Sequence, residues 1–415
     1  MRLLLHVRFR GIIVGTMDDL NFWGKRVLAR VDINSPMKDG RLLDRSRIEA
    51  HAKTIRELHE SGAKVVVMAH QGRPGGDDFD HLEQHARALE PLVGTSVKFV
   101  KDVTGPEALR LIDSLEPGDV LVLDNVRLLA EENVQAEPER LVKTLLVREL
   151  APHFDVYVGD AFAAAHRSQP SVAGFPYVLP SVAGRVMESE LRGLSKVLDV
   201  SSRSFFIGGS KVDDVVKVMP NLIGKGTVMT GGLVALTFAK AYGQHLGPAE
   251  DIVRSLGVEV IEGARRVLEK GKVMVPVDYV VERPDGEVEV QEAGQELSGV
   301  PKDVGPMTVA AYRDVIDASD AVIFKGTAGV VEDPRFRRGT VALLEAALKS
   351  GAFVLVGGGH ASAALSWVEE GLRKAVGYTS TAGGAMLYLA AGLRMPGVEA
   401  LAYSYSKFIA RGGWP

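Results

Sequence analysis

Residues 47–69 read RIEAHAKTIRELHESGAKVVVMA, a helical pattern followed directly by a strand pattern. Ile48, Ile55 and Leu58 recur at helical spacing, and Gly62 is a normal residue just past a helix end. An apolar run follows at 64–69, and a similar β-rich run at 27–31 precedes the helix. A strand, a helix and a strand in this order predict a right-handed crossover and a parallel sheet.

The same alternation continues along the chain in two series. Further β-rich runs lie at 97–100, 120–124 and 155–158 in the first half, and at 205–207, 227–229, 272–275, 321–324 and 352–356 in the second. Together they predict an α/β protein with two doubly wound, Rossmann-like parallel-sheet domains. A helical pattern at 184–198 and a looser segment to Ser204 separate the two series, and we expect a hinge helix there.

Five segments are expected. Residues 1–16 are a candidate N-terminal extension, because Met17 directly precedes a plausible helix start. The first domain should span 17–180, the hinge helix and linker 181–200, and the second domain 201–392. The tail, 393–415, carries apolar side chains such as Tyr405 and Phe408 and should dock back on the body. An acidic hairpin is expected at 282–290, around a Pro-Asp-Gly turn.

Composition narrows the class of protein. The chain has 415 residues, of which 46% are hydrophobic and 25% charged, enough for two cored domains. A net charge of -4 argues against a broad basic surface for nucleic acid or membrane. The absence of cysteine excludes disulfides and thiolate metal sites and fits a reducing cytoplasm. No apolar run approaches the roughly 20 residues that a bilayer requires, so we expect a cytoplasmic protein.

Arginines gather just past the predicted strands of the first half. In such sheets ligands bind beyond the carboxyl ends of the strands, and a guanidinium grips phosphate or carboxylate with two parallel hydrogen bonds. Like charges around one mouth repel unless an anion is regularly present. The sequence therefore predicts a ligand with more than one negative charge. The charged residues concerned are Arg47, His70, Arg73, Arg127 and Arg167.

Glycine clusters mark strand ends in the second half, at 208–209, 231–232 and 357–359, and Lys211 stands at a predicted helix start. Amide donors and a helix dipole at such turns suit the phosphate chain of a nucleotide. Tight packing of strand against helix would explain paired glycines equally well. Neither a P-loop nor a dinucleotide fingerprint is present, which argues against an NAD-dependent dehydrogenase.

These motifs, in this order, closely resemble the phosphoglycerate kinase family, and the resemblance runs from about Phe22 to Leu401. The histidine after the triple glycine resembles the archaeal branch. The stretches that carry the resemblance are 30–36, 70–74, 124–127, 159–167, 208–212, 276–279, 303–306, 326–332, 357–359 and 380–384.

The resemblance implies a hinge-bending kinase of glycolysis and gluconeogenesis. It would move a phosphoryl group reversibly between ATP and 3-phosphoglycerate, giving ADP and 1,3-bisphosphoglycerate, with Mg²⁺ carried by the nucleotide. The first domain would bind 3-phosphoglycerate and the second the nucleotide. A monomer is expected, with a dimer as the alternative.

The resemblance also implies residue roles. Asp32 and Asn34 would hold the glycerate end, Arg47 would face the transferred phosphoryl group, and Glu332 would accept the ribose hydroxyls. The implied substrate-binding residues are Asp32, Asn34, Arg47, His70, Gln71, Gly72, Arg73, Arg127 and Arg167. The implied nucleotide-binding residues are Gly208, Gly209, Lys211, Gly231, Gly326, Glu332, Gly357, Gly358, Gly359 and His360. The implied catalytic residues are Arg47, Lys211, Gly359 and Gly384.

The chain departs from the family pattern at several positions. Val215 stands where many members have a second lysine, and Lys217 should point roughly 120° away from Lys211 around a helix. His360 replaces an aspartate that contacts the magnesium nucleotide, which leaves the metal ligand open, with Asp213 or Asp214 as candidates.

His81 and His85 lack a suitably placed glutamate for a zinc motif and are expected on a solvated helix face.

The alternative function is a ligand-binding or interaction protein on the same fold that has lost catalysis. The presence of Arg47 and Lys211 argues against it, because residues that face a transferred group contribute little to binding alone.

Overall fold

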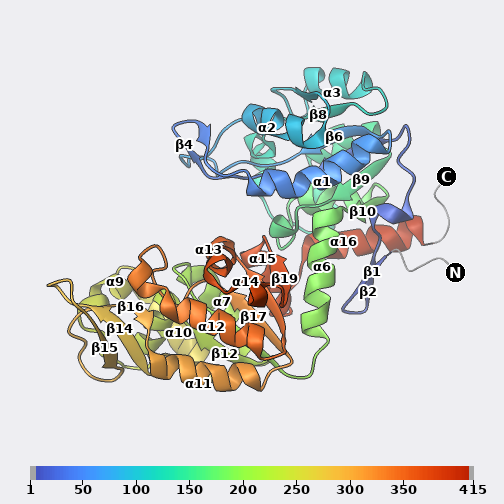
Figure 1. Cartoon of the computed structure of the whole chain (residues 1–415). Helices are drawn as coiled ribbons and strands as arrows, with labels where there is room; N and C mark the ends of the chain where they lie inside the picture. Colours follow the sequence, from blue (N-terminus) through green and yellow to red (C-terminus); the bar gives the residue numbers. More distant parts are fainter. Residues whose placement is uncertain (1–5, 411–415) are drawn as a thin grey trace. The chain divides into compact units, whose positions relative to one another are not determined.

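The computed structural model describes residues 6–410, and the chain divides into two compact units (Figure 1). Unit 1 contains the chain up to Arg192 together with the segment from Arg394 onward, and unit 2 is the continuous stretch Gly193–Leu393. The predicted fold class, two parallel-sheet α/β domains, is confirmed. No helix within residues 6–410 is long and apolar enough to cross a membrane.

Unit 1 is built on a six-stranded, all-parallel sheet in the order β10-β9-β3-β6-β8-β7. The strands are β3 (Arg26–Arg30), β6 (Lys64–Met68), β7 (Val97–Phe99), β8 (Val120–Val122), β9 (Val156–Gly159) and β10 (Ser181–Ala183). Val27, Val65 and Val120 are fully buried, as expected for a sheet covered on both faces. One face packs against α1 (Ser46–Glu60) and α2 (Glu83–Val93), whose apolar stripes share its core.

Shorter elements complete unit 1. The helices are α3 (Pro106–Asp113), α4 (Pro138–Leu141) and α5 (Leu145–Leu150), and a small hairpin joins β4 (Met37–Lys38) to β5 (Arg41–Leu42). Residues placed by the sequence in a candidate extension form an antiparallel pair, β1 (Val7–Phe9) and β2 (Ile12–Val14). Phe9 and Val14 are buried, and the Ala183 amide donates to the Gly15 carbonyl at 2.8 Å. This segment therefore packs as part of unit 1.

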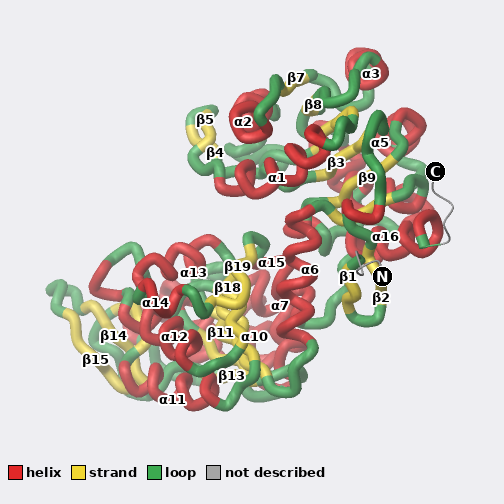
Figure 2. Tube along the Cα trace, turned by 45° about the vertical axis from the view of Figure 1, so that its right-hand side comes forward, coloured by secondary structure: helices red, strands yellow, loops and turns green. Residues whose placement is uncertain are grey.

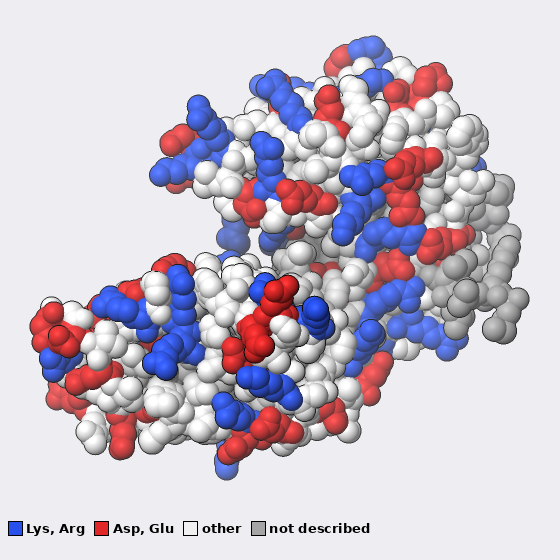
Figure 3. Space-filling model, in the orientation of Figure 1, with Lys and Arg blue, Asp and Glu red and all other residues white. Residues whose placement is uncertain are grey.

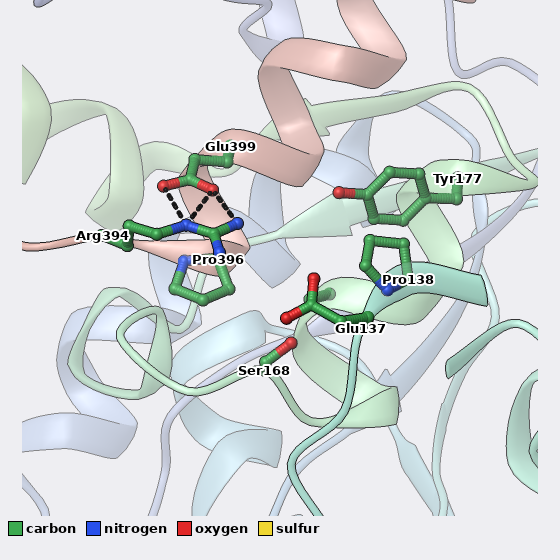
Figure 4. Close-up of a pocket in the computed structure, with 8 residues that line it drawn as sticks. Glu137, Pro138, Ser168, Tyr177, Arg394, Pro396 and Glu399 are labelled. Carbon is green, nitrogen blue, oxygen red and sulfur yellow. Dashed lines mark hydrogen bonds and ion pairs between the residues drawn. The ribbon is translucent and has the colours of Figure 1, made fainter. Parts of the chain in front are cut away.

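The segment after Leu393 returns to unit 1 as α16 (Pro396–Ser404). The Gly397 amide donates to the Ala165 carbonyl at 2.9 Å, and Leu401 is buried. At the start of α16, Arg394 forms an ion pair with Glu399 at 2.8 Å beside a small cavity of about 40 Å³ (Figure 4). The backbone hydrogen bond to Ala165 and apolar burial thus attach the C-terminal helix to unit 1.

Unit 2 has a second all-parallel sheet, in the order β13-β12-β11-β17-β18-β19 (Figure 2). Its strands are β11 (Arg203–Ile207), β12 (Thr227–Thr230), β13 (Val273–Met274), β17 (Ala321–Lys325), β18 (Phe353–Gly357) and β19 (Val376–Ser380). Counted along the unit this is the doubly wound order 3-2-1-4-5-6. In that order the chain reverses direction across the sheet between β11 and β17, the position where such folds bind ligands.

Helices cover this sheet, and a smaller three-stranded sheet flanks it. The helices of unit 2 are α7 (Val212–Ile223), α8 (Gly232–Ala241), α9 (Glu250–Arg254), α10 (Val258–Lys270), α11 (Pro306–Asp317), α12 (Arg338–Lys349), α13 (Gly359–Ala364), α14 (Glu370–Arg373) and α15 (Gly383–Ala390). The predicted acidic hairpin is present as β14 (Asp278–Glu282) and β15 (Val288–Glu292), and β16 (Val300–Val304) extends it to three antiparallel strands. The predicted helix at 184–198 is α6 (Arg185–Leu198), and the division between the units falls within it.

Charge is mixed on the surface. On the face drawn in Figure 3, Lys and Arg side chains are interspersed with Asp and Glu on each unit. This mixture agrees with the net charge of -4.

Candidate active site

The centre of the site in unit 1 is an ion pair between Asp32, just past β3, and Arg47, in the first turn of α1. Arg47 Nη1 lies 2.7 Å from Asp32 Oδ2, and the Arg47 side chain is 35% exposed whereas that of Asp32 is 3% exposed. Burial alone would raise the pKa of Asp32, but the surrounding positive charge, above all that of Arg47, lowers it to about 2. Asp32 therefore stays ionised at neutral pH and holds a guanidinium whose other face is open to a ligand.

The loop after β6 is fixed by hydrogen bonds to its backbone. The Gly72 amide donates to Asn34 Oδ1 at 2.8 Å, and the Gly72 carbonyl accepts from Arg127 Nη1. Gly72 has a φ of +62°, and a Cβ there would meet the Asp78 carbonyl oxygen at 2.4 Å. Only glycine fits this position, so Asn34 and Arg127 are both oriented by a turn that the sequence makes obligatory.

Gln71 supports this loop from the inside. Its side chain is fully buried, and Nε2 donates to the carbonyls of Ser35 at 2.8 Å and Asp78 at 2.9 Å. His85 Nε2 lies 3.0 Å from Gln71 Oε1 and is also fully buried. The expected solvated face for His81 and His85 is therefore wrong for His85, because a polar partner inside the loop compensates its burial. The Gln71 side chain therefore positions the loop.

The positive charges of several arginines in unit 1 act on Arg127 and Arg167. Burial, and then Arg167 and Arg30, lower the pKa of Arg127 to about 10. The pKa of Arg167 is also lowered, chiefly by burial and with Arg30 and Arg73 contributing, while Asp32 opposes the shift. Arg73 itself is exposed. Positive charges gathered in this way suit a multiply charged anion.

His70 contributes differently from the expectation that counted it among the cations. It is buried, and burial and then Arg30 hold its pKa well below the ordinary value. Arg30 Nη2 lies 3.1 Å from His70 Nδ1, and an arginine can only donate. The neutral ring therefore accepts at Nδ1 and carries its proton on Nε2, where it can donate to an anion.

Arg30 is a site residue to which sequence reasoning gave no role. It is buried in β3, and its Nε donates to Ser171 Oγ at 2.8 Å. Ser171 in turn donates from its amide to buried Glu132 at 2.9 Å. Burial raises the pKa of Glu132, and Arg30 is the first of the groups that oppose this rise. The available signal was an arginine within an apolar strand, which needs a buried polar partner.

Unit 2 contains a cavity of about 350 Å³. Apolar and glycine residues form most of its wall, and among them are Gly209, Leu236, Tyr279, Val304 and Ala328. Glu332 and His360 lie at its edge, with His360 Nε2 3.6 Å from Glu332 Oε1, and both side chains are largely exposed. An apolar cavity with a few polar groups at its rim suits a nucleoside.

Paired glycines could serve either phosphate binding or tight packing of strand against helix. The glycines near this cavity are of two kinds in this respect. A Cβ at Gly208 would meet the Thr327 carbonyl oxygen at 2.1 Å, and one at Gly326 would meet the Gly208 carbonyl oxygen at 2.1 Å. Packing alone therefore requires these two glycines. A Cβ at Gly359 or Gly384 would meet no atom within 4 Å, so packing does not require a glycine at either position.

Lys211 and its helix differ from the family pattern in a defined way. Lys211 is exposed and immediately precedes α7, whereas Val215, one turn later, is fully buried in the core. Lys217 is exposed on α7. Within the described part of the chain, no group of three or more His, Asp or Glu side chains is arranged to hold a metal ion. Asp213 and Asp214 are exposed in the first turn of α7.

Comparison with known proteins decides the family. The phosphoglycerate kinase family model matches residues 17–392. The chain belongs to the phosphoglycerate kinase family. Curated phosphoglycerate kinases from Aeropyrum pernix and Saccharolobus solfataricus are 44% and 43% identical, over 95% of this chain and 97% and 98% of theirs.

Solved structures agree with this membership. The phosphoglycerate kinase of Pyrococcus horikoshii superposes with a TM-score of 0.84 at 36% identity, covering 95% of this chain and all of that one. The phosphoglycerate kinase of Coxiella burnetii gives a TM-score of 0.74 at 31% identity, covering 94% of this chain and 98% of that one.

Proposed function

We propose that this chain is a phosphotransferase with a carboxyl group as acceptor. It transfers a phosphoryl group reversibly between ATP and 3-phosphoglycerate, giving ADP and 1,3-bisphosphoglycerate, as a step of glycolysis and gluconeogenesis. The observation that carries the proposal is that unit 1 holds two sets of cationic side chains suited to negative charge. Arg47, held by Asp32, is one, and the arginine cluster of Arg73, Arg127 and Arg167 is the other.

The proposed binding follows from these two sets of side chains. The 3-phosphate occupies the arginine cluster and accepts a hydrogen bond from His70 Nε2. The carboxylate faces Arg47, and the hydroxyl group binds beside Asp32 and Asn34. The nucleoside fills the cavity of unit 2, with Glu332 accepting from the ribose hydroxyls. Lys211 and the amides at Gly359 and Gly384 face the phosphate chain, because a helix start presents unpaired N–H groups.

The proposed reaction needs no covalent intermediate on the protein. A carboxylate oxygen of 3-phosphoglycerate forms a bond to the γ-phosphorus, and the bond from that phosphorus to the bridging oxygen of ADP breaks. No proton has to move, so the protein contributes positioning and charge, for which about 7–11 kcal/mol of the barrier is available. Arg47 and Lys211 neutralise the charge that develops on the transferred group. We infer that bending at α6 brings the two bound substrates in line.

Magnesium fits the donor set of unit 2. Mg²⁺ commonly binds through one or two carboxylates together with substrate phosphates, and Asp213 or Asp214 would supply the carboxylate. The ion would neutralise part of the phosphate charge when it is bound with the nucleotide. His360, a nitrogen ligand beside Glu332, suits a phosphate oxygen better than it suits this ion. We further propose a cytoplasmic location, which fits a cysteine-free chain. We also propose that the protein is a monomer.

A coupled assay of ADP formation tests the proposal. Purified protein should turn over with ATP, Mg²⁺ and 3-phosphoglycerate. Arg47→Ala should lower kcat by about 100-fold or more, as expected for removal of a donor to the transition state, while 3-phosphoglycerate still binds at the arginine cluster. Arg87→Ala, at an exposed arginine on α2, is the matched control and should behave as wild type. Nucleotide binding without any turnover by the wild type would instead support the ligand-binding alternative.

A further inference from the structure

Lys325 occupies a distinctive place in unit 2. It is the last residue of β17, and its neighbours in the sheet are Ile207, the last residue of β11, and Gly357, the last of β18. Its carbonyl accepts from the Gly208 amide at 2.7 Å. Lys325 therefore stands between the glycine turns at 208–209 and 357–359, at the point where the strand order reverses.

The ammonium of Lys325 has no carboxylate partner within ion-pair distance among residues 6–410. Other partly buried lysines of unit 2 are paired. Lys240 lies 2.8 Å from Glu250, and Lys302 forms an ion pair with Glu282. Burial, and then the nearby Lys211, lower the pKa of Lys325 to about 8, and Asp214 only partly opposes this. A partly buried cation next to another cation is costly unless an anion regularly sits beside both.

We propose that Lys325 binds the phosphate chain of the nucleotide, as a second ammonium alongside Lys211. This rests on the proposed function and names a further residue of the same site. The charge that Val215 does not supply from α7 comes instead from the end of β17. Lys217 is an exposed side chain on α7. Lys325, in contrast, lies near enough to Lys211 for the charge of Lys211 to lower its pKa.

Nucleotide binding should also change the protonation of Lys325. Because the pKa of Lys325 is lowered to about 8, we expect part of its charge to be lost near that pH when no nucleotide is bound. A phosphate beside the ammonium favours the charged form and raises its pKa, so binding takes up a proton at this pH. Affinity for ADP should be greatest below pH 8 and should fall as the pH rises above it.

The test compares ADP with adenosine, which lacks phosphates, by titration calorimetry on the full chain. Lys325→Met keeps the length of the side chain and removes its charge. It should weaken ADP binding by about tenfold or more and change adenosine binding less than twofold. Lys217→Met removes an exposed lysine from the same unit and should leave both affinities unchanged. Wild-type ADP affinity in Lys325→Met would overturn the proposal.

A second measurement keeps the proposal falsifiable if Lys325→Met also loses adenosine binding through misfolding. Wild-type protein is titrated at pH 8 in buffers of different ionisation enthalpy. Proton uptake with ADP but not with adenosine supports the proposal, and equal uptake with both overturns it. A wild type that binds ADP but never phosphorylates 3-phosphoglycerate would instead refute the proposed function, and the comparison of ADP with adenosine would still decide the role of Lys325.

Discussion

Gly72 and Gly75 lie in the same loop after β6, and both have a positive φ, +62° and +80°. They differ in their surroundings, because a Cβ at Gly75 meets no atom within 4 Å whereas one at Gly72 collides with the Asp78 backbone. Gly75→Ala should lower the free energy of unfolding by about 1 kcal/mol through backbone strain alone. Gly72→Ala should cost about 3 kcal/mol, because a backbone clash adds to the strain. Urea unfolding of the two variants checks this, and similar losses would contradict it.

The charge on Asp32 should appear in the pH dependence of stability. Its pKa of about 2 in the folded chain lies below the ordinary 3.8. The stabilisation is therefore fully present above about pH 4 and is lost as the pH falls toward 2. At neutral pH it amounts to about 2 kcal/mol, and about half of that remains at pH 3. The difference in unfolding free energy between wild type and Asp32→Asn should shrink accordingly between pH 7 and pH 3. A constant difference would show that the ionised carboxylate is not the stabilising form.

Helix α6 begins at a buried carboxylate. Asp160 Oδ1 accepts from the amides of Val186 at 2.8 Å and Met187 at 3.1 Å, and its Oδ2 lies 2.7 Å from His51 Nδ1 on α1. Asp160→Ala removes both the helix cap and the partner of a buried histidine, and should lower the free energy of unfolding by about 3 kcal/mol. Asp44→Ala, which removes an exposed carboxylate that caps the Ser46 amide, should cost only about 1 kcal/mol. Chemical denaturation ranks the two, and a reversed order would refute this role for Asp160.

Elements with strong local patterns could be predicted from the sequence, and those defined by tertiary contact could not. Each run predicted as a strand overlaps a strand of the structure, and the helix expected at 47–61 is α1 at Ser46–Glu60. The three-residue strand β10 and the polar strand β16 carry no period long enough to detect, and both are defined by their neighbours. The strand at 376–380, β19, is only partly buried and was also missed.

The candidate site shows the same division. Asp32, Arg47 and the arginine cluster follow strands, and the sequence therefore predicts their neighbourhood. The neutral state of His70 and the role of Arg30 depend on burial, which requires the packed sheet. Sequence alone also cannot separate Gly208, where packing requires glycine, from Gly359, where it does not.

At the scale of the whole molecule, each unit has its own core, and a cavity should destabilise only the unit that contains it. Leu401 on α16 is buried in unit 1, and Leu355 on β18 is buried in unit 2. Truncation of either to alanine should cost about 2–5 kcal/mol. Hydrogen exchange should show faster opening in unit 1 for Leu401→Ala and in unit 2 for Leu355→Ala. Equal acceleration in both units with either variant would show that they unfold as one.

Unit 1 is assembled from both ends of the chain, while unit 2 is a single uninterrupted stretch. Residues are added in order during synthesis, and domains fold as units when their residues become available. All of unit 2 precedes α16 in the chain, so every residue that it needs is present before that helix is made. Unit 1, although most of it is made first, has to wait for its last helix. A chain truncated just before α16 should therefore contain a folded second unit and an incomplete first one.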